Sequence, residues 1–425
     1  MKPTRSISRS PKPRPYWLSR LALLSAMPLA FFGVLLFTRA SIPYELMFDE
    51  IHYVPAAKAL LLGTDNLNWV HPPLAKYLMG LGWWVFSDRL HLLGEPAVFR
   101  WVAVVFGLWS LWAVRAWMLA LGFSAKTSIA AVWLTGFNFL WFVQSKTAML
   151  DIFYVAFALW GVLDVWRFKS GARMWRGWVF LGLAFACKWS AAPYIVLALF
   201  MSASPLFVRL AGGAVAGLAY AVTFVPLAFL KNGPVPLTDF FKYHQRMLDG
   251  FDSIATAAHP YQSSFWEWPT MARPIWYLFD SSSAGERCIW AGGNPVLFWT
   301  VFPLLFVVVW FALRHGDRIA RILAAMYWVP LLFWVLAPRK LQLFYYYLAP
   351  SFMLGPIVVW AHERLGAGGI FIRGGAGEIR EARGWLLMGF VLLCAAAFVY
   401  FLPIMDGRLL TPGRFQDYMW FRSWI

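Results

Sequence analysis

Long apolar segments separated by short basic runs constrain this chain more than any other feature of its sequence. Residues 21–37 form the first such segment, and the twenty residues before it carry six Lys or Arg and no acidic residue. A helix needs about 20 apolar residues to cross the hydrocarbon core of a bilayer. Hydrophobic residues make up 61% of the 425 residues and charged residues only 13%, so the chain lacks the polar residues that a soluble protein needs for its surface. We expect one all-α, polytopic membrane domain over residues 1–425.

The basic runs predict the orientation of these segments, because Lys and Arg gather on the cytoplasmic side of membrane proteins. With the N-terminus inside, alternation places 17 Lys or Arg but only 4 acidic residues in the main inner segments. The large outer loops, about 40–95 and 231–295, carry more acidic than basic residues. A cleaved signal peptide is the alternative for the first segment, but no small-residue cleavage site precedes Arg39. The map places the C-terminus outside and has about eleven transmembrane helices, near residues 21–37, 96–120, 127–143, 150–166, two short ones within 177–208, 211–230, 296–313, 322–337, 343–361 and 385–403.

The positions of the basic residues also argue against a nucleic-acid partner. A net charge of +17 would suit such a partner, but the charges lie in short runs between apolar segments, where the orientation rule explains them. The three cysteines lie far apart, so neither a disulfide framework nor a cysteine metal cluster is expected: Cys187, Cys288 and Cys394.

Two adjacent carboxylates, Asp49 and Glu50, lie in the first outer loop about eleven residues beyond the first span. They could be incidental loop charges. The functional alternative is a general base, because a carboxylate at the mouth of a water-poor cleft can have a raised pKa and accept a hydroxyl proton. His52 would share a helical face with Asp49 at a spacing of three. These three side chains are the best cluster of metal-ligand types in the chain, and we expect no metal.

Several further charges lie where hydropathy does not explain them. His71 and Lys76 flank a double proline, which suits either a helix start at the interface or an anion site at a helix N-terminus. Arg100 lies within the second predicted span and Asp151 begins the fourth, whereas Lys188 lies between two apolar half-spans. Ionisable groups at such depths usually line a cavity or a polar path, although each could instead extend to the interface.

The long outer loop is rich in Trp, Tyr and Pro, with a basic residue at Arg273. It could simply anchor in the headgroup layer. We expect instead a lid of short helices over a cavity that contains Asp49 and Glu50, with His259, Tyr261 and Arg273 pointing inward. In that arrangement the large rings of Trp266 and Trp268 would pack on lipid or on the first outer loop. Arg339 and Lys340 precede a Tyr run at the predicted outer start of span 10, where the orientation rule does not explain two cations.

These features alone fit two kinds of protein: a transferase that uses a membrane-anchored phosphosugar, or a transporter with charges in its pathway. Transporters tend to have paired halves with interrupted helices in matching positions, and the sequence has no such repeat. It also lacks the Walker, G-x-S-x-G and H-E-x-x-H motifs.

Four groups of residues together resemble the protein O-mannosyltransferases, polyprenyl-phosphate-mannose-dependent enzymes of the GT-C membrane glycosyltransferase superfamily. They read F-D-E-I-H-Y at 48–53, H-P-P-L-A-K at 71–76, M-L-D at 149–151, and an aromatic stretch at 259–277 that contains W-E-W-P and R-P-I-W-Y. The likeness extends from about residue 40 to W-F-R-S-W at 420–424. The Asp-Glu pair alone is less specific, since lipid A aminoarabinose transferases carry a similar pair followed by Arg-Tyr.

The resemblance implies an inverting glycosyltransferase that moves mannose from a polyprenyl phosphate to Ser or Thr hydroxyls of secreted or membrane proteins. Asp49 would be the base, Glu50 would orient the acceptor, and no cofactor is implied beyond the lipid-linked donor. The long loop is too short for the β-trefoil insert of eukaryotic members, which points to a bacterial inner membrane with the site on its outer face. The alternatives are a lipid A or other glycolipid sugar transferase and, less favoured, a transporter.

The candidate binding residues are divided between the two substrates. A donor phosphate or sugar would be bound by residues among Arg100, Arg273, Arg339, Lys76, Lys188, His71, His259 and Tyr261. The acceptor would contact residues among His52, Trp266 and Trp268.

Overall fold

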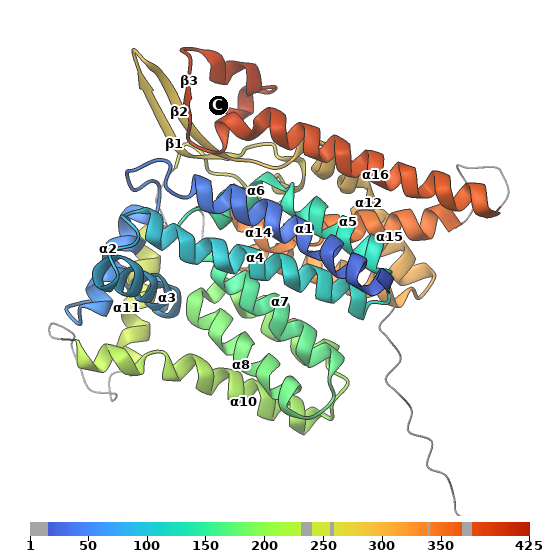
Figure 1. Ribbon diagram of the computed structural model, residues 1–425. Coiled ribbons are helices and arrows are strands. Elements are labelled where there is room, and N and C mark those ends of the chain that lie inside the picture. Colours follow the sequence, from blue (N-terminus) through green and yellow to red (C-terminus); the bar gives the residue numbers. More distant parts are fainter. Residues whose placement is uncertain (1–15, 231–239, 256–258, 338–340, 368–375) are drawn as a thin grey trace, which may run out of the picture.

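The computed structural model describes residues 16–230, 240–255, 259–337, 341–367 and 376–425, and these form a bundle of long helices that run side by side (Figure 1). Each of the eleven predicted spans overlaps a helix. By length and composition, five helices of the described part could cross a membrane, or six if one bent pair is a single span. The bundle helices are α1 (Tyr16–Arg39), α4 (Ala97–Ala120), α5 (Ala125–Gly136), α6 (Phe139–Ser145), α7 (Asp151–Arg167), α8 (Ala172–Cys187), α9 (Ala192–Met201), α10 (Leu206–Val222), α12 (Pro295–Arg314), α13 (Arg318–Leu336), α14 (Leu348–Ser351), α15 (Leu354–Ala367) and α16 (Ala376–Phe401).

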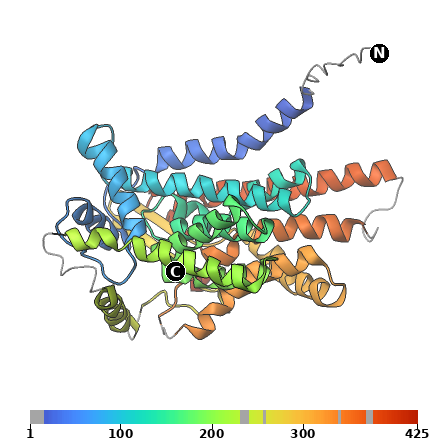
Figure 2. The same ribbon diagram turned by 90° about the horizontal axis from the view of Figure 1, so that it is seen from below.

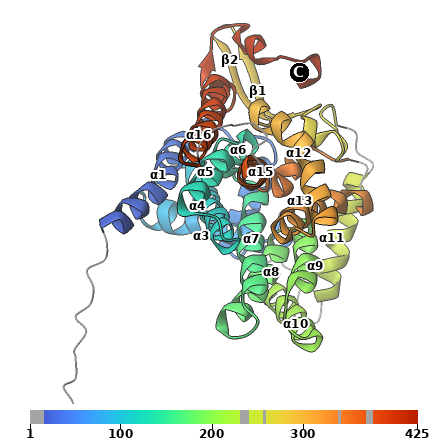
Figure 3. The ribbon, with the colours of Figure 1, turned by 90° about the vertical axis from the view of Figure 1, so that its right-hand side faces the viewer.

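Helix α7 lies in the middle of this bundle, as the view along the helices shows (Figure 3). Every residue from Asp151 to Leu159 is buried. A helix that is apolar on all sides is expected in such a position, because it has no face to offer to water. Asp151, the one acidic residue of its first turn, is therefore carried into the protein interior.

The apolar stretch 177–208 breaks at Lys188, as its charge pattern suggested. Lys188 has an extended backbone (φ −160°, ψ 135°) after α8 ends at Cys187. A short 3₁₀ turn, Trp189–Ala191, then leads into α9, where Pro193 is compatible with the first turn. The break places the Lys188 side chain inside the bundle.

The short elements gather at one end of the bundle, at the left of Figure 1. They are α2 (Glu50–Leu61), α3 (Leu74–Trp83) and α11 (Phe240–Ala255). The opposite end carries the turns between α7 and α8 and between α12 and α13, as the view from below also shows (Figure 2).

A three-stranded antiparallel sheet, which the all-helical prediction did not include, lies at the same end as α2 and α3 (Figure 1). It consists of β1 (Ile275–Ser282), β2 (Gly285–Ala291) and β3 (Leu409–Leu410). The strands β1 and β2 form a hairpin with a two-residue turn, and Gly285, the first residue of β2, adopts φ +137°. We expected short helices in the long outer loop. Helix α11 and the 3₁₀ turn Trp268–Thr270 are such helices, whereas residues 275–291 form the hairpin, because β-branched and aromatic residues of β1 favour a strand.

The C-terminal segment packs back on this hairpin. The carboxylate of Glu286 accepts hydrogen bonds from the Gly413 amide at 2.8 and 3.0 Å. The indole N–H of Trp276 donates to the carbonyl of the buried Trp424, and the Trp424 indole donates to Met271. The last residues therefore help to fix the loop that precedes β1.

Candidate active site

A cavity of about 270 Å³ lies beside the start of α2. Its walls come from the first outer loop, the long outer loop and the segment before α14. The lining residues are Phe48, Asp49, His52, Tyr53, Asn68, Val70, His71, His259, Leu341, Leu343 and Tyr345. The structure thus brings together four of the predicted site residues, namely Asp49, His52, His71 and His259.

Asp49 immediately precedes α2, and its carboxylate has no ion-pair partner among the described residues. Its carboxylate accepts a hydrogen bond from the Tyr53 hydroxyl at 3.3 Å, one helical turn ahead. Protein atoms crowd the carboxylate, and this desolvation raises the pKa of Asp49 above its ordinary value. The charges of Lys188 and His52 oppose the rise, and that of Asp151 adds to it. A carboxylate with a raised pKa is a better proton acceptor than an ordinary aspartate.

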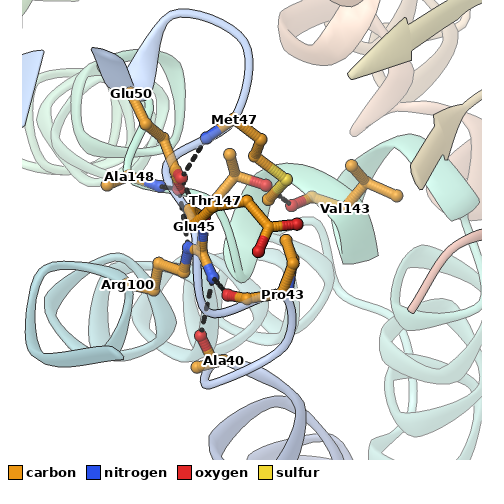
Figure 4. Close-up of polar contacts among 9 residues, drawn as sticks. All are labelled: Ala40, Pro43, Glu45, Met47, Glu50, Arg100, Val143, Thr147 and Ala148. Carbon is orange, nitrogen blue, oxygen red and sulfur yellow. Dashed lines mark hydrogen bonds and ion pairs between the residues drawn. The ribbon is translucent and has the colours of Figure 1, made fainter. Parts of the chain in front are cut away.

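Glu50, by contrast, does not line the cavity. Its carboxylate forms a buried ion pair with Arg100 (Figure 4). Both side chains are fully buried, and the guanidinium contacts both carboxylate oxygens at 2.8 and 2.6 Å. The amides of Ala148 and Met47 also donate to the Glu50 carboxylate, at 2.8 and 3.1 Å. Glu50 therefore links the first outer loop to α4 and to the turn between α6 and α7.

Arg100 was predicted to bind the donor phosphate, but all five of its N–H groups are engaged within the chain. Two N–H groups bond to Glu50, and the other three donate to backbone carbonyls before α2. The distances to those carbonyls are 3.2 Å for Ala40, 2.6 Å for Pro43 and 2.8 Å for Glu45. Since arginine has only five donors, a phosphate would have to displace one of these bonds.

A second buried ion pair joins Lys188 to Asp151, at 2.9 and 2.8 Å from the ammonium to the two carboxylate oxygens. The ammonium also lies over the rings of Tyr345 and Tyr346, at 5.1 and 5.0 Å. Tyr345 lines the cavity, so the pair lies directly behind the cavity wall. Lys188 is held between one carboxylate and two aromatic faces, an arrangement that stabilises a buried cation.

Lys76, another residue predicted to bind the sugar donor, anchors the segment 66–71 that forms part of the cavity wall. Its buried ammonium donates to the Asn66 amide oxygen at 3.1 Å and to the carbonyl of His71 at 3.0 Å, and it bonds to the Asn68 carbonyl. These three acceptors use all the donors of a lysine. His71 itself lines the cavity, with its ring 5.9 Å from that of Tyr53.

Among the described residues of the long outer loop, His259 is the one that lines the cavity. The backbone amide of Tyr261 donates to His259 Nδ1 at 3.1 Å, which leaves the proton of the neutral ring on Nε2. Partial burial lowers the pKa of His259, and the nearby charge of Asp49 opposes this. The neutral ring can thus present an N–H donor close to Asp49.

Arg273 and Tyr261 do not line the cavity, contrary to our expectation. Arg273 instead donates to the carbonyl of Pro260 at 3.1 and 2.7 Å and to that of Ser423 at 3.4 Å, with its guanidinium 5.9 Å from the Tyr261 ring. Arg273 therefore fastens the His259 turn to the C-terminal segment, because two backbone carbonyls lie within its reach.

The two tryptophans expected to contact lipid, the first outer loop or the acceptor have different environments. Trp268 is fully buried: its indole donates to Ser263 at 3.0 Å and its ring packs against Trp334 of α13 and against Tyr346. It can contact neither lipid nor an acceptor, since its partners enclose it. Trp266 is 65% exposed and remains available to either. Arg339 lies outside the described residues.

Within the described part of the chain, no group of three or more His, Cys, Asp or Glu residues is arranged to hold a metal ion. The three cysteines are buried and free.

Three aromatic wall residues were not among the predicted site residues: Phe48, Tyr53 and Tyr345. Phe48 and Tyr53 belong to the same short motif as Asp49, and proximity in sequence could have indicated them. Tyr345 belongs to a Tyr run that an aromatic belt at the membrane interface explains equally well, so its sequence alone does not reveal its place in the wall.

Comparison with known proteins identifies two adjoining matches. Residues 26–211 match the family model described as dolichyl-phosphate-mannose-protein mannosyltransferase, and residues 236–424 match the C-terminal four-transmembrane region of protein-O-mannosyltransferase. A relative from Corynebacterium glutamicum, named polyprenol-phosphate-mannose–protein mannosyltransferase, is 25% identical over 89% of this chain and 88% of its own length.

Solved structures share the fold. The Saccharomyces cerevisiae protein O-mannosyltransferase Pmt1-Pmt2 complex bound to the sugar donor matches with a TM-score of 0.76 at 12% identity, over 96% of this chain and 93% of that chain. ArnT from Cupriavidus metallidurans matches with a TM-score of 0.54 at 16% identity, over 92% of this chain and 72% of that one. The chain thus shares its fold with these two proteins.

Proposed function

Because the chain belongs to the protein O-mannosyltransferase family, we propose that it transfers mannose from a polyprenyl phosphate to Ser or Thr hydroxyls of proteins. The observation that carries the proposal is the placement of Asp49: its carboxylate lines a cavity, has a raised pKa and accepts only the Tyr53 hydroxyl among the bonds of the described residues. The acceptors would be secreted or membrane proteins, reached at the outer face of a bacterial inner membrane.

The reaction is a single displacement at the anomeric carbon. The acceptor hydroxyl oxygen attacks C1 of the mannose, the bond from C1 to the phosphate oxygen breaks, and the polyprenyl phosphate leaves with both electrons of that bond. Asp49 takes the hydroxyl proton as the new bond forms. Attack from the face opposite to the leaving group inverts the anomeric centre. A placed general base of this kind contributes about 10²–10⁴-fold to the rate.

The proposed role of Glu50 is to hold Asp49 in place rather than to contact the acceptor. Its carboxylate is buried and bonded to Arg100, Ala148 and Met47. The side chain of Asp49, the preceding residue, lines the cavity. Arg100 has the same role from the other side of the ion pair.

For the leaving phosphate, the supported ligands are the imidazoles that line the cavity, His71 and His259. The Nε2–H of a neutral His259 can donate to a phosphate oxygen. Lys188 would attract the phosphate by its charge without contacting it, since its ammonium is already bonded to Asp151. Arg339 remains a further candidate from the segment before Leu341.

The test compares two carboxylate-to-amide variants of the first outer loop. Asp49→Asn should abolish mannose transfer from polyprenyl-phosphate mannose to a Ser/Thr acceptor, whereas Asp88→Asn, which changes a half-exposed carboxylate, should leave it intact. Retention of near wild-type transfer by Asp49→Asn would remove Asp49 as the base.

Mass spectrometry of secreted proteins and of lipid A, with and without the gene, separates the proposal from its rival. Loss of hexose from Ser or Thr residues supports protein mannosylation. Intact glycoproteins together with an altered lipid A mass would favour a glycolipid sugar transferase instead.

A further inference from the structure

The residue before Asp49 has an unusual backbone. Phe48 adopts φ +48°, in the left-handed region, where a bulky side chain is rare because its Cβ crowds the backbone. Such a conformation persists only where the surrounding structure enforces it, and it occurs preferentially at functional sites. The structure around Phe48 must therefore hold the residue in this conformation.

Two buried tyrosines hold the Phe48 ring. The ring stacks on Tyr277 of β1 with centroids 4.4 Å apart and planes 7° from parallel, and it meets the edge of Tyr345 at 5.7 Å. Tyr277 is itself fixed, since its hydroxyl accepts a hydrogen bond from Gln144 of α6 at 2.7 Å. The first outer loop is thus clamped between the hairpin of the long outer loop and the bundle.

The turn at Phe48 lets neighbouring side chains diverge. The amide of Met47, on one side, donates to Glu50, whose carboxylate is tied to Arg100. Asp49, on the other side, lines the cavity. A shift of the Phe48 backbone toward an ordinary conformation would rotate Asp49 relative to Glu50, while the ion pair would keep Glu50 in place.

We propose that Phe48, clamped by Tyr277, is a positioning residue that fixes the direction of the Asp49 carboxylate within the cavity. The inference rests on the proposed function, in which Asp49 is the base. Phe48 acts through Asp49 and Tyr277 acts through Phe48, so the two form one unit.

The kinetic test uses the full chain with a matched set of variants. Phe48→Leu keeps the Cβ but removes the stack, and Tyr277→Leu removes the other ring; each should lower kcat by about 10- to 100-fold, the scale of a misplaced catalytic group, with the KM for the donor within about 2-fold. Phe48→Tyr and Tyr277→Phe retain the stack and should keep kcat within about 3-fold of the wild type, a small fraction of that loss. The double Leu variant should lose no more than the worse single variant, because the residues act together.

The control is Phe137→Leu, the same change in another buried stack. Phe137 lies at the end of α5, where its ring stacks on Trp133 at 5.5 Å, and it does not line the cavity. The kcat of the Phe137→Leu variant should match that of the wild type. A loss equal to that of Phe48→Leu would show that any lost stack impairs the enzyme and would overturn the proposal.

A second measurement does not depend on activity. Carbodiimides react with protonated carboxyl groups, so the labelling of Asp49 by a carbodiimide and an amine, followed by mass spectrometry across pH, reports its protonation. Labelling of wild-type Asp49 should persist above pH 3.8, the ordinary pKa of an aspartate, and Phe48→Leu should move the Asp49 profile toward lower pH. If kcat falls but the profile stays in place, Phe48 does not position Asp49. If the wild type transfers no mannose, the proposed function fails and the labelling profile alone decides the present inference.

Discussion

Replacing Arg100 by lysine tests whether the buried ion pair anchors the first outer loop or serves the donor. Lysine keeps the positive charge but has three N–H donors instead of five, so at least two of the acceptors around Arg100 lose their bonds. All of these acceptors are protein groups in a fully buried site. A hydrogen bond to a charged group contributes about 1.5–3 kcal/mol, so the expected loss is about 3–6 kcal/mol.

The matched control is Arg176→Lys at the other end of the bundle. Arg176 contacts Asp164 at 2.7 Å, but its side chain is 47% exposed, and exposed pairs contribute about 0–1 kcal/mol. At about 2 °C per kcal/mol for a large domain, the Tm of Arg100→Lys should fall by about 6 °C or more. The Tm of Arg176→Lys should fall by about 2 °C or less on the same scale.

The assay is thermal unfolding of the purified protein in detergent, followed by tryptophan fluorescence, with the donor KM measured on the same preparations. The reasoning is refuted if Arg100→Lys unfolds no earlier than Arg176→Lys. A raised donor KM with an unchanged Tm would show instead that Arg100 binds the phosphate, as its position in the sequence suggested.

Four further predictions rest on the charged groups described above. The pKa of Asp49 is raised, so the folded state binds its proton more tightly than the unfolded chain does. Folding stability is therefore lost as pH rises through that pKa. At neutral pH the Asp49→Asn variant should unfold at a temperature no lower than that of the wild type. For the same reason kcat/KM of the wild type should fall on acidification at a pH above 3.8, the ordinary value for Asp, and an acid limb at or below it would argue against this base. Lys188→Met should destabilise the fold by about 3–5 kcal/mol, because it leaves the Asp151 charge buried alone, and adding Asp151→Leu should recover most of that loss in thermal unfolding; an equally unstable double variant would contradict this. Arg273→Lys should speed amide hydrogen exchange around Pro260 without changing the donor KM, whereas the reverse result would identify Arg273 as a phosphate ligand.

The fold was predictable where a single physical signal dominated. Hydrophobic length and basic runs indicate a multi-helix membrane protein, and the charge at Lys188 indicated the break between α8 and α9. The hairpin β1–β2 was not predicted, because its residues also suit an aromatic interface segment. Its third strand comes from residues 409–410, more than a hundred positions away, a pairing that no local pattern reveals.

Part of the cavity lining was predictable for a related reason. Cavity residues from three separate segments were indicated by their chemistry, namely Asp49, His71 and His259. Sequence could not distinguish a charge that faces substrate from one that faces another charge. Arg100 and Lys188 were candidates for the donor because buried cations are costly, and the structure provides each with a carboxylate partner.

The pairing of buried charges also distinguishes the two adjacent acids. Among the described residues, Glu50 is matched by Arg100 and Asp151 by Lys188, whereas Asp49 accepts a hydrogen bond from Tyr53 and has no ion-pair partner. A buried carboxylate without a partner is unfavourable as an anion, and burial therefore raises its pKa. Lys146 shows the converse: its ammonium has no hydrogen-bond partner in the described part of the chain, and burial lowers its pKa to about 7. Lys146, however, does not line the cavity, whereas Asp49 does. An unpaired acid that lines a cavity suits proton abstraction from a hydroxyl, so the electrostatics support the proposal that Asp49 is the base and Glu50 a structural anchor.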